Sequence, residues 1–227
     1  MGAVLIETMR VREGRIPLLE RHLARLAGSL AALGLPQPSP DVAALVEPFA
    51  GCGEAVLRIE VAAGRASVTV RDLPRLDPPV VITASAAHRP YRHKTAERTC
   101  FAAAAAEAVA VGANDALLLT EDGWVAEGTV WSVFWWEREG EGQGGDQLRT
   151  PTLELGILPG IGRQRVLELG LGLVPQQGRD ARAALTGKSL FLTNAVRGVV
   201  PIATLDGNPV PADARTQQLA ARFWPAG

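Results

Sequence analysis

The chain has 227 residues, of which 47% are hydrophobic and 21% charged, and its formal net charge is −1. These values are typical of a soluble globular protein and provide no overall positive field to recruit nucleic acid or an anionic membrane. Two cysteines and three histidines without metal-motif spacing predict neither a disulfide scaffold nor a metal site. No apolar run is long enough to span a bilayer and no signal-peptide pattern opens the chain, so we expect a cytoplasmic protein.

The first part of the chain mixes strand and helix patterns. A loose alternation opens it, and from Leu19 the apolar residues recur at helical spacing until Gly34 closes the segment. Two later runs alternate around a glycine turn and predict an antiparallel pair. The expected elements are a strand at 3–10, a turn and short strand at 12–18, a helix at 19–33, a helix at 40–50, and paired strands at 54–62 and 66–71.

Three prolines between Leu73 and Pro79 interrupt these patterns and predict a linker. We therefore expect an α+β protein with a small α/β domain at 1–73, a linker at 74–79 and a larger domain at 80–227. The larger domain is predicted to contain strands at 80–86, 116–120, 124–126, 130–136, 171–175 and 189–194, helices from Thr95 to Val111 and at 160–170, 179–186 and 211–223, and a polar, glycine-rich hairpin tip at 137–147.

Three features of the larger domain supply what a pyridoxal phosphate enzyme needs. Lys94 precedes an alanine-rich helix pattern, Glu127 opens an E-G-T turn, and L-P-G-I-G-R at 158–163 starts a helix. A lysine amine forms a Schiff base with this cofactor, and a carboxylate keeps the ring nitrogen protonated so that the ring accepts electrons. The free N–H groups at a helix N-terminus bind a phosphate. These features predict pyridoxal 5'-phosphate as the cofactor.

The order of the motifs resembles that of the class IV aminotransferases, which are the fold-type IV pyridoxal phosphate enzymes. The resemblance covers nearly the whole chain and implies the two-domain, D-amino acid aminotransferase-like α+β fold. The family's D-R-G-x-x-Y-G-D-G stretch is not found ahead of the first motif, so we expect a truncated N-terminal hairpin. The motifs are I-E-T-M-R at 6–10, H-L-A-R-L at 22–26, K-T-A-E-R at 94–98, G-A-N-D-A-L-L-L at 112–119, W-V-A-E-G-T at 124–129, T-P at 150–151, G-I-L-P-G-I-G-R at 156–163 and F-L-T-N-A-V-R-G-V-V-P-I at 191–202.

The resemblance also implies roles for individual residues. Lys94 would carry the cofactor and later move a proton between substrate and cofactor carbons, while Glu127 would bind the ring nitrogen. Arg25 would pair with the phosphate, as a guanidinium does well. The other implied cofactor contacts are Leu158 under the ring, the backbone N–H groups of Ile161 and Gly162 at the phosphate, and Ala195 beside it. The candidates for a substrate carboxylate are Arg98, Arg10 and Arg197.

Several residues depart from the family pattern. Trp131 and Ser132 stand where a small residue and an asparagine are usual, and the tryptophan is expected either to crowd the cofactor edge or to turn outward. Gly162 replaces a threonine, and Ala195 replaces the phosphate-binding threonine of the aminotransferases. The tryptophans at 131, 135 and 136 are expected in the core or at a dimer contact.

Arg98 and Ala195 both resemble the lyase branch of the family. The expected function is therefore that of a 4-amino-4-deoxychorismate lyase, which forms 4-aminobenzoate and pyruvate for folate biosynthesis, with a small amino compound as substrate and a homodimer as the working form. A branched-chain or D-amino acid aminotransferase is the first alternative. A cofactor-binding homologue with weakened catalysis is the second.

Overall fold

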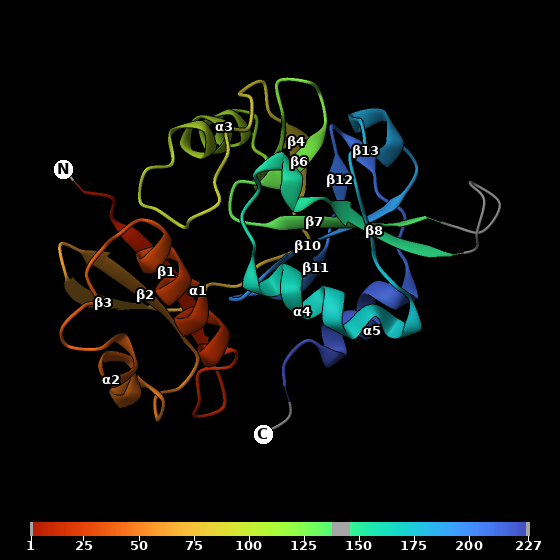
Figure 1. The fold of residues 1–227 in the computed structure, drawn as a ribbon. Coiled ribbons are helices and arrows are strands. Elements are labelled where there is room, and N and C mark those ends of the chain that lie inside the picture. The colour runs from red at the N-terminus through yellow and green to blue at the C-terminus, as the bar shows by residue number, and fades with distance from the viewer. Residues whose placement is uncertain (1, 138–145, 226–227) are drawn as a thin grey trace. The chain divides into compact units, whose positions relative to one another are not determined.

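The computed structural model describes residues 2–137 and 146–225 of the chain (Figure 1). These residues form two compact units, which are considered separately below. The first unit comprises Met1–Arg75, His93–Glu97 and Pro225–Gly227, and the second comprises Leu76–Arg92 and Arg98–Trp224. The hairpin tip expected at 137–147 falls almost entirely outside the described residues.

The first unit is an antiparallel sheet with helices packed against it. The sheet has the strand order β1-β2-β3, and buried residues face each other across it, as Met9 does with Leu57. The buried positions of β1 and β2 alternate along much of each strand, which is the pattern of a sheet with one face on the core. The elements are β1 (Leu5–Val11), α1 (Leu19–Ala32), α2 (Val42–Val46), the 3-10 helix η1 (Glu47–Phe49), β2 (Ala55–Ala62) and β3 (Arg65–Arg71).

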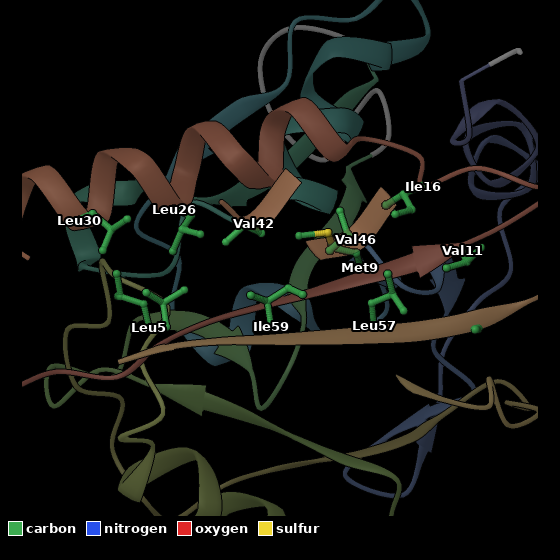
Figure 2. Close-up of a cluster of buried hydrophobic side chains, with 12 residues drawn as sticks. Leu5, Met9, Val11, Ile16, Leu26, Leu30, Val42, Val46, Leu57 and Ile59 are labelled. Atoms are coloured by element: carbon green, nitrogen blue, oxygen red, sulfur yellow. The ribbon is translucent and has the colours of Figure 1, made fainter. Parts of the chain in front are cut away.

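The core of this unit lies between α1 and the sheet. Figure 2 shows Leu26 and Leu30 of α1 pointing toward Leu5 and Ile59 of the strands. Helical spacing places these two leucines on one face, and that face is buried while residues such as Gly28 remain exposed. The amphipathic helix predicted at 19–33 is therefore confirmed.

The second unit contains two five-stranded sheets, with the orders β13-β12-β4-β5-β6 and β11-β10-β7-β8-β9. Its strands are β4 (Val80–Thr83), β5 (Asp115–Leu119), β6 (Val125–Gly128), β7 (Ser132–Glu137), β8 (Gln147–Pro151), β9 (Gln176–Gly178), β10 (Ser189–Asn194), β11 (Gly198–Pro201), β12 (Thr204–Leu205) and β13 (Asn208–Pro209). Its helices are α3 (Thr99–Ala110), α4 (Ile161–Leu169), α5 (Ala214–Arg222) and the 3-10 helices η2 (Leu153–Leu155), η3 (Gly170–Gly172) and η4 (Arg182–Leu185).

Strand β7 is buried along most of its length. Val133 and Trp135 belong to one apolar cluster, whereas Phe134 stacks on Phe191 of β10 with ring centroids 5.3 Å apart. The indole N–H of Trp136 donates to the Thr216 hydroxyl at 2.9 Å, so this polar group is satisfied in the interior. The strand predicted at 130–136 is thus found at Ser132–Glu137 as a central strand with both faces covered, whereas Val130 lies before it and is exposed.

The structure corrects three of the elements expected from sequence. No strand is found at 171–175, because Gly170 and Leu171 both have positive φ and form a 3-10 turn before β9. Only an isolated bridge joins Arg12 to Arg15 where a short strand was expected. The long helix begins at Thr99 rather than Thr95, because the residues around Thr95 pair with the start of β1. No helix among the described residues is long and apolar enough to cross a membrane.

Candidate active site

Lys94 lies on an extended segment that pairs with the first strand of the first unit. Its carbonyl accepts a hydrogen bond from the Ile6 N–H at 2.8 Å, and the Ala96 N–H donates to the Val4 carbonyl at 2.8 Å. These bonds fix the backbone from Lys94 to Ala96 beside the start of β1, where Leu5 and Thr95 form an isolated β-bridge. Lys94 therefore has a fixed backbone position beside β1.

A buried cluster of Glu7, His22 and Arg25 lies in the same unit. Arg25 donates two hydrogen bonds to the Glu7 carboxylate, from Nε to Oε1 at 2.8 Å and from Nη2 to Oε2 at 2.6 Å. His22 Nδ1 lies 2.6 Å from Oε2, so both carboxylate oxygens have partners. Burial by itself would raise the pKa of Glu7, but the charge of Arg25 and the hydrogen bonds from His22 and Arg25 lower that pKa to about 2.

The charge of Lys94 acts on this cluster. The pKa of His22 is lowered, and burial of the imidazole is the largest cause. The hydrogen bond and the negative charge of Glu7 oppose this shift, whereas the positive charges of Arg25 and Lys94 add to it. The next residue, His93, lies with Nδ1 3.1 Å from the Ser29 hydroxyl on α1. The first unit thus places Lys94 near the buried ion pair that holds Arg25.

Glu127 lies at the end of β6 in the second unit and is buried there. The two hydrogen bonds that its side chain makes to described residues both involve Oε1. This oxygen lies 2.9 Å from His88 Nε2 and accepts from the Leu158 backbone N–H at 3.1 Å. Oε2 has no hydrogen-bond partner within the described parts of the chain. Because its side chain is only 6% exposed, the second oxygen is a candidate acceptor for a bound group.

The turn after Glu127 is held by a buried aspartate. Asp115 accepts from the Thr129 N–H at 2.8 Å through Oδ1 and from the Thr129 hydroxyl at 2.9 Å through Oδ2. Burial raises the pKa of Asp115 although these hydrogen bonds oppose the shift. The Thr129 carbonyl in turn accepts from the guanidinium of Arg98, so the backbone after Glu127 is anchored on both sides.

The N-terminus of α4 packs directly on the end of β10. A Cβ on Gly162 would lie 2.7 Å from Asn194 Cα, closer than real side chains come, so only glycine allows this approach. No side chain caps the helix, whose first N–H groups, including those of Ile161 and Gly162, lack an acceptor inside the helix. The side chain of Asn194 accepts from the N–H groups of Val196 and Arg197 and orders the turn that contains Ala195.

The two unusual residues after E-G-T have separate positions. Trp131 is 7% exposed and belongs to the apolar cluster of the second unit, so it lies in the core, one of the two locations expected for the tryptophans at 131–136. The Ser132 hydroxyl would lie 2.9 Å from a Cβ placed on Gly160, so it faces the start of α4. Trp135 and Trp136 are buried in the same unit, which removes them from any dimer contact.

The three arginines proposed for a substrate carboxylate lie in different surroundings. Arg10 pairs with Glu54 at 2.6 Å in the first unit. Arg98 lies with its guanidinium 5.0 Å from the centre of the Phe101 ring, in addition to its bond to Thr129. The backbone of Arg197 belongs to the turn after β10. Within the described residues no cluster of histidine, cysteine or carboxylate side chains forms a metal site.

The sequence patterns did not single out Glu7 or Asp115 as functional residues. His22 was considered only within H-L-A-R-L and the apolar face of its helix, and His88 only as one of three histidines without metal-motif spacing. Their partners lie far away in the chain, and nothing in the local pattern marks a lone buried histidine. The only available signal was the place of Glu7 within I-E-T-M-R and of Asp115 within G-A-N-D-A-L-L-L.

Comparisons with known proteins identify the family of the chain. Residues 4–205 match the family model of class IV amino-transferases. Aminodeoxychorismate lyase of Bacillus subtilis (strain 168) is 35% identical over 95 residues, a match that spans 40% of this chain and only 30% of that protein. The chain therefore belongs to the class IV aminotransferase family and is an enzyme of the pyridoxal phosphate-dependent class, as predicted.

Solved structures confirm the predicted fold class. A hypothetical aminotransferase from Mycobacterium tuberculosis in its PLP-bound form is 25% identical, with a TM-score of 0.85 over 98% of this chain and 87% of that one. A fold IV transaminase from Curtobacterium pusillum is 26% identical, with a TM-score of 0.79 over 98% and 83%. A branched-chain aminotransferase from Thermoproteus uzoniensis, solved with norvaline, shares the fold at 22% identity, with a TM-score of 0.83 over 98% and 84%.

Proposed function

We propose that this chain is a 4-amino-4-deoxychorismate lyase that uses pyridoxal 5'-phosphate to form 4-aminobenzoate and pyruvate. The observation that carries the proposal is Glu127, a buried carboxylate with one oxygen engaged and the other open. The match to the lyase of Bacillus subtilis supports the choice of reaction. Arg98 and Ala195, which resemble the lyase branch, support it as well.

The residues present fit this cofactor. Its ring nitrogen needs an acceptor, which Glu127 Oε2 offers, and its phosphate needs donors, which the uncapped start of α4 offers. Arg25, whose Nε and Nη2 donate to Glu7, is proposed to pair with the phosphate on the family resemblance alone. Leu158 and Ala195 are proposed to line the ring and the phosphate. When bound, pyridoxal phosphate supplies an electron-accepting ring that stabilises negative charge on the substrate carbon next to the amine.

The roles of the protein groups follow from their chemistry. Lys94 would hold the cofactor through its amine until the substrate's amine takes its place, and the freed Lys94 amine would then remove the proton from the ring carbon that bears the substrate's amine. Glu127 keeps a proton on the cofactor's ring nitrogen by placing a negative charge beside it. The bond between the ring carbon and the oxygen of the enolpyruvyl group then breaks and the ring becomes aromatic, while the enolpyruvate released takes up the proton held by Lys94 and becomes pyruvate. Arg10, Arg98 and Arg197 remain the proposed contacts for the substrate's carboxylates.

The cofactor assignment is tested by attachment. The chain has two lysines, Lys94 and Lys188, and Lys188 lies 3.7 Å from Glu137. After borohydride reduction of the cofactor-loaded protein, peptide mass spectrometry should find the cofactor on Lys94 alone. Lys94→Ala should lose attachment and turnover, whereas the matched variant Lys188→Ala should keep both. A cofactor found on Lys188, or retained by Lys94→Ala, contradicts the assignment.

Arg25 is tested by affinity. A hydrogen bond to a charged group contributes roughly 1.5–3 kcal/mol, so Arg25→Ala should weaken cofactor binding at least about tenfold. The control is Arg10→Ala, whose guanidinium is paired with Glu54 and which has no proposed cofactor contact. An equal loss in both variants contradicts the placement of the phosphate at Arg25.

A branched-chain or D-amino acid aminotransferase is the second candidate, because the fold neighbours include a branched-chain aminotransferase. The two reactions differ in their need for a keto acid. A lyase releases pyruvate from aminodeoxychorismate with no added keto acid, and we expect this result. Turnover of leucine with 2-oxoglutarate, together with no pyruvate from aminodeoxychorismate, assigns the chain to the aminotransferases.

We also propose a homodimer, on the family resemblance alone, since the tryptophans once considered for its contact are buried within one chain. Sedimentation of the cofactor-loaded protein at micromolar concentration should give twice the chain mass of 24.0 kDa. A species of single-chain mass with full cofactor occupancy contradicts this assembly.

A further inference from the structure

His88 contacts the carboxylate that faces the cofactor ring in the proposed function. Its side chain is fully buried, and Nε2 lies 2.9 Å from Glu127 Oε1. The other ring nitrogen, Nδ1, is buried without a hydrogen-bond partner among the described residues. Among the described residues, the imidazole of His88 therefore directs its one hydrogen bond to Glu127.

We infer that His88 is a positioning residue that, with the Leu158 N–H, holds Glu127 Oε1 so that Oε2 alone is presented to the cofactor's ring nitrogen. The inference rests on the proposed function, in which Glu127 binds that nitrogen. His88 itself does not touch the cofactor in this arrangement. Its effect passes through the orientation of the carboxylate.

The physical reason is the freedom of a glutamate carboxylate. The last torsion of a glutamate is broad and roughly two-fold, so one hydrogen bond leaves the plane of the carboxylate poorly defined. Two donors from different segments, a side chain and a backbone N–H, restrict that rotation by binding the same oxygen. A carboxylate held in this way loses less freedom when its second oxygen binds a ligand.

Packing holds the imidazole in turn. The ring of His88 meets Phe101 edge to face, with centroids 5.8 Å apart and an angle of 77° between the planes. Phe101 belongs to the buried cluster around α3. The orientation of Nε2 toward Glu127 is therefore set by the core, and a substitution at His88 can move the donor without removing the backbone donor at Leu158.

The test compares two substitutions that differ in the reach of their amide. His88→Gln puts an amide nitrogen as many bonds from Cβ as Nε2, whereas the amide of His88→Asn reaches only to the level of Nδ1. Each purified protein is titrated with pyridoxal phosphate and with its carbocyclic analogue, in which CH replaces the ring nitrogen. The ratio of the two dissociation constants reports the contact between Glu127 and the ring nitrogen and needs no turnover.

We expect the parent protein and His88→Gln to prefer the natural cofactor to a similar degree. In His88→Asn this preference should fall by about tenfold, the effect of weakening one charge-assisted contact. His88→Leu, which keeps the volume and has no donor, should show the same loss and replaces His88→Asn if that variant does not fold. Phe101→Leu keeps the donor but removes the ring that packs on the imidazole, so it should lower the preference by less than His88→Asn does.

The outcomes separate the inference from the proposed function. An unchanged preference in both His88→Asn and His88→Leu, with a lost preference in Glu127→Gln, overturns the role of His88 and leaves that of Glu127 intact. An unchanged preference in Glu127→Gln overturns the proposed role of Glu127. A loss in His88→Gln equal to that in His88→Asn also overturns the inference, because the reach of the donor then has no effect.

Discussion

Each of the two units buries a glutamate against a histidine, but the two pairs are built differently. Glu7 has partners on both oxygens, from His22 and from two nitrogens of Arg25. Glu127 has His88 and a backbone N–H on one oxygen, and its other oxygen has no partner among the described residues. The same two residue types thus make a closed ion pair in one unit and an open carboxylate in the other.

The difference shows which features of a buried acid indicate function. A bidentate arginine compensates the buried charge of Glu7 and fixes its own guanidinium in return. No arginine among the described residues hydrogen-bonds to Glu127, although its charge opposes the fall that burial causes in the pKa of Arg163. Its second oxygen is therefore available to a ligand that brings a proton or a positive charge. Burial and a histidine contact are common to both, and the number of satisfied oxygens distinguishes them.

The largest expected effect on stability comes from opening the closed pair. Arg25→Met leaves Glu7 buried with His22 as its remaining partner, and breaking a buried pair in this way costs about 3–5 kcal/mol of unfolding free energy. Urea unfolding of the cofactor-free protein measures the change. Arg10→Met is the matched control, because its partner Glu54 is 46% exposed, and it should cost less than about 1 kcal/mol. Equal costs contradict the difference drawn between buried and exposed pairs.

The closed pair should also make stability depend on acid pH. The pKa of Glu7 is about 2 in the folded protein, below its ordinary value of 4.5. Its contribution is therefore complete above pH 4.5 and is lost as the pH falls toward 2, with a size on the order of 3 kcal/mol. The unfolding free energies of the parent and of Glu7→Gln, compared at several pH values, should converge over this interval. A difference that stays constant down to pH 2 contradicts the prediction.

A smaller effect is expected where the second unit brings α4 onto β10. Gly162→Ala would place its Cβ 2.7 Å from Asn194 Cα, and such overpacking costs about 1–3 kcal/mol. The displaced helix start should also bind the cofactor's phosphate less well. Gly28→Ala lies on an exposed part of α1 with open space around it and should instead stabilise by about 0.5–1 kcal/mol. Thermal unfolding and cofactor titration of both variants check the opposite signs.

The smallest change in stability is expected at the open carboxylate. Glu127→Gln keeps an oxygen to accept from His88 and Leu158 and removes a buried charge, so unfolding free energy should change by less than about 1 kcal/mol. Turnover should nevertheless fall strongly, because a neutral amide does not hold a proton on the ring nitrogen. Parent-like turnover in this variant contradicts the proposed role of Glu127.

The sequence by itself determined the features that depend on local pattern. Alternation predicted the strands at 3–10 and 54–62, and the spacing of leucines predicted α1, because periodicity records which face of an element meets the core. The order of the short motifs was sufficient for the family, the fold class and the cofactor, which the comparisons support.

The tertiary structure decided the pairings between residues far apart in the chain. The segment around Lys94 follows residues of the second unit, yet it extends along β1 because backbone groups of Val4 and Ile6 bind it there. The partners of Glu127 and Arg25, and the need for glycine at 162, likewise come from distant segments. Local patterns do not contain these contacts, since a histidine or glutamate has the same propensities whether or not a distant chain segment reaches it.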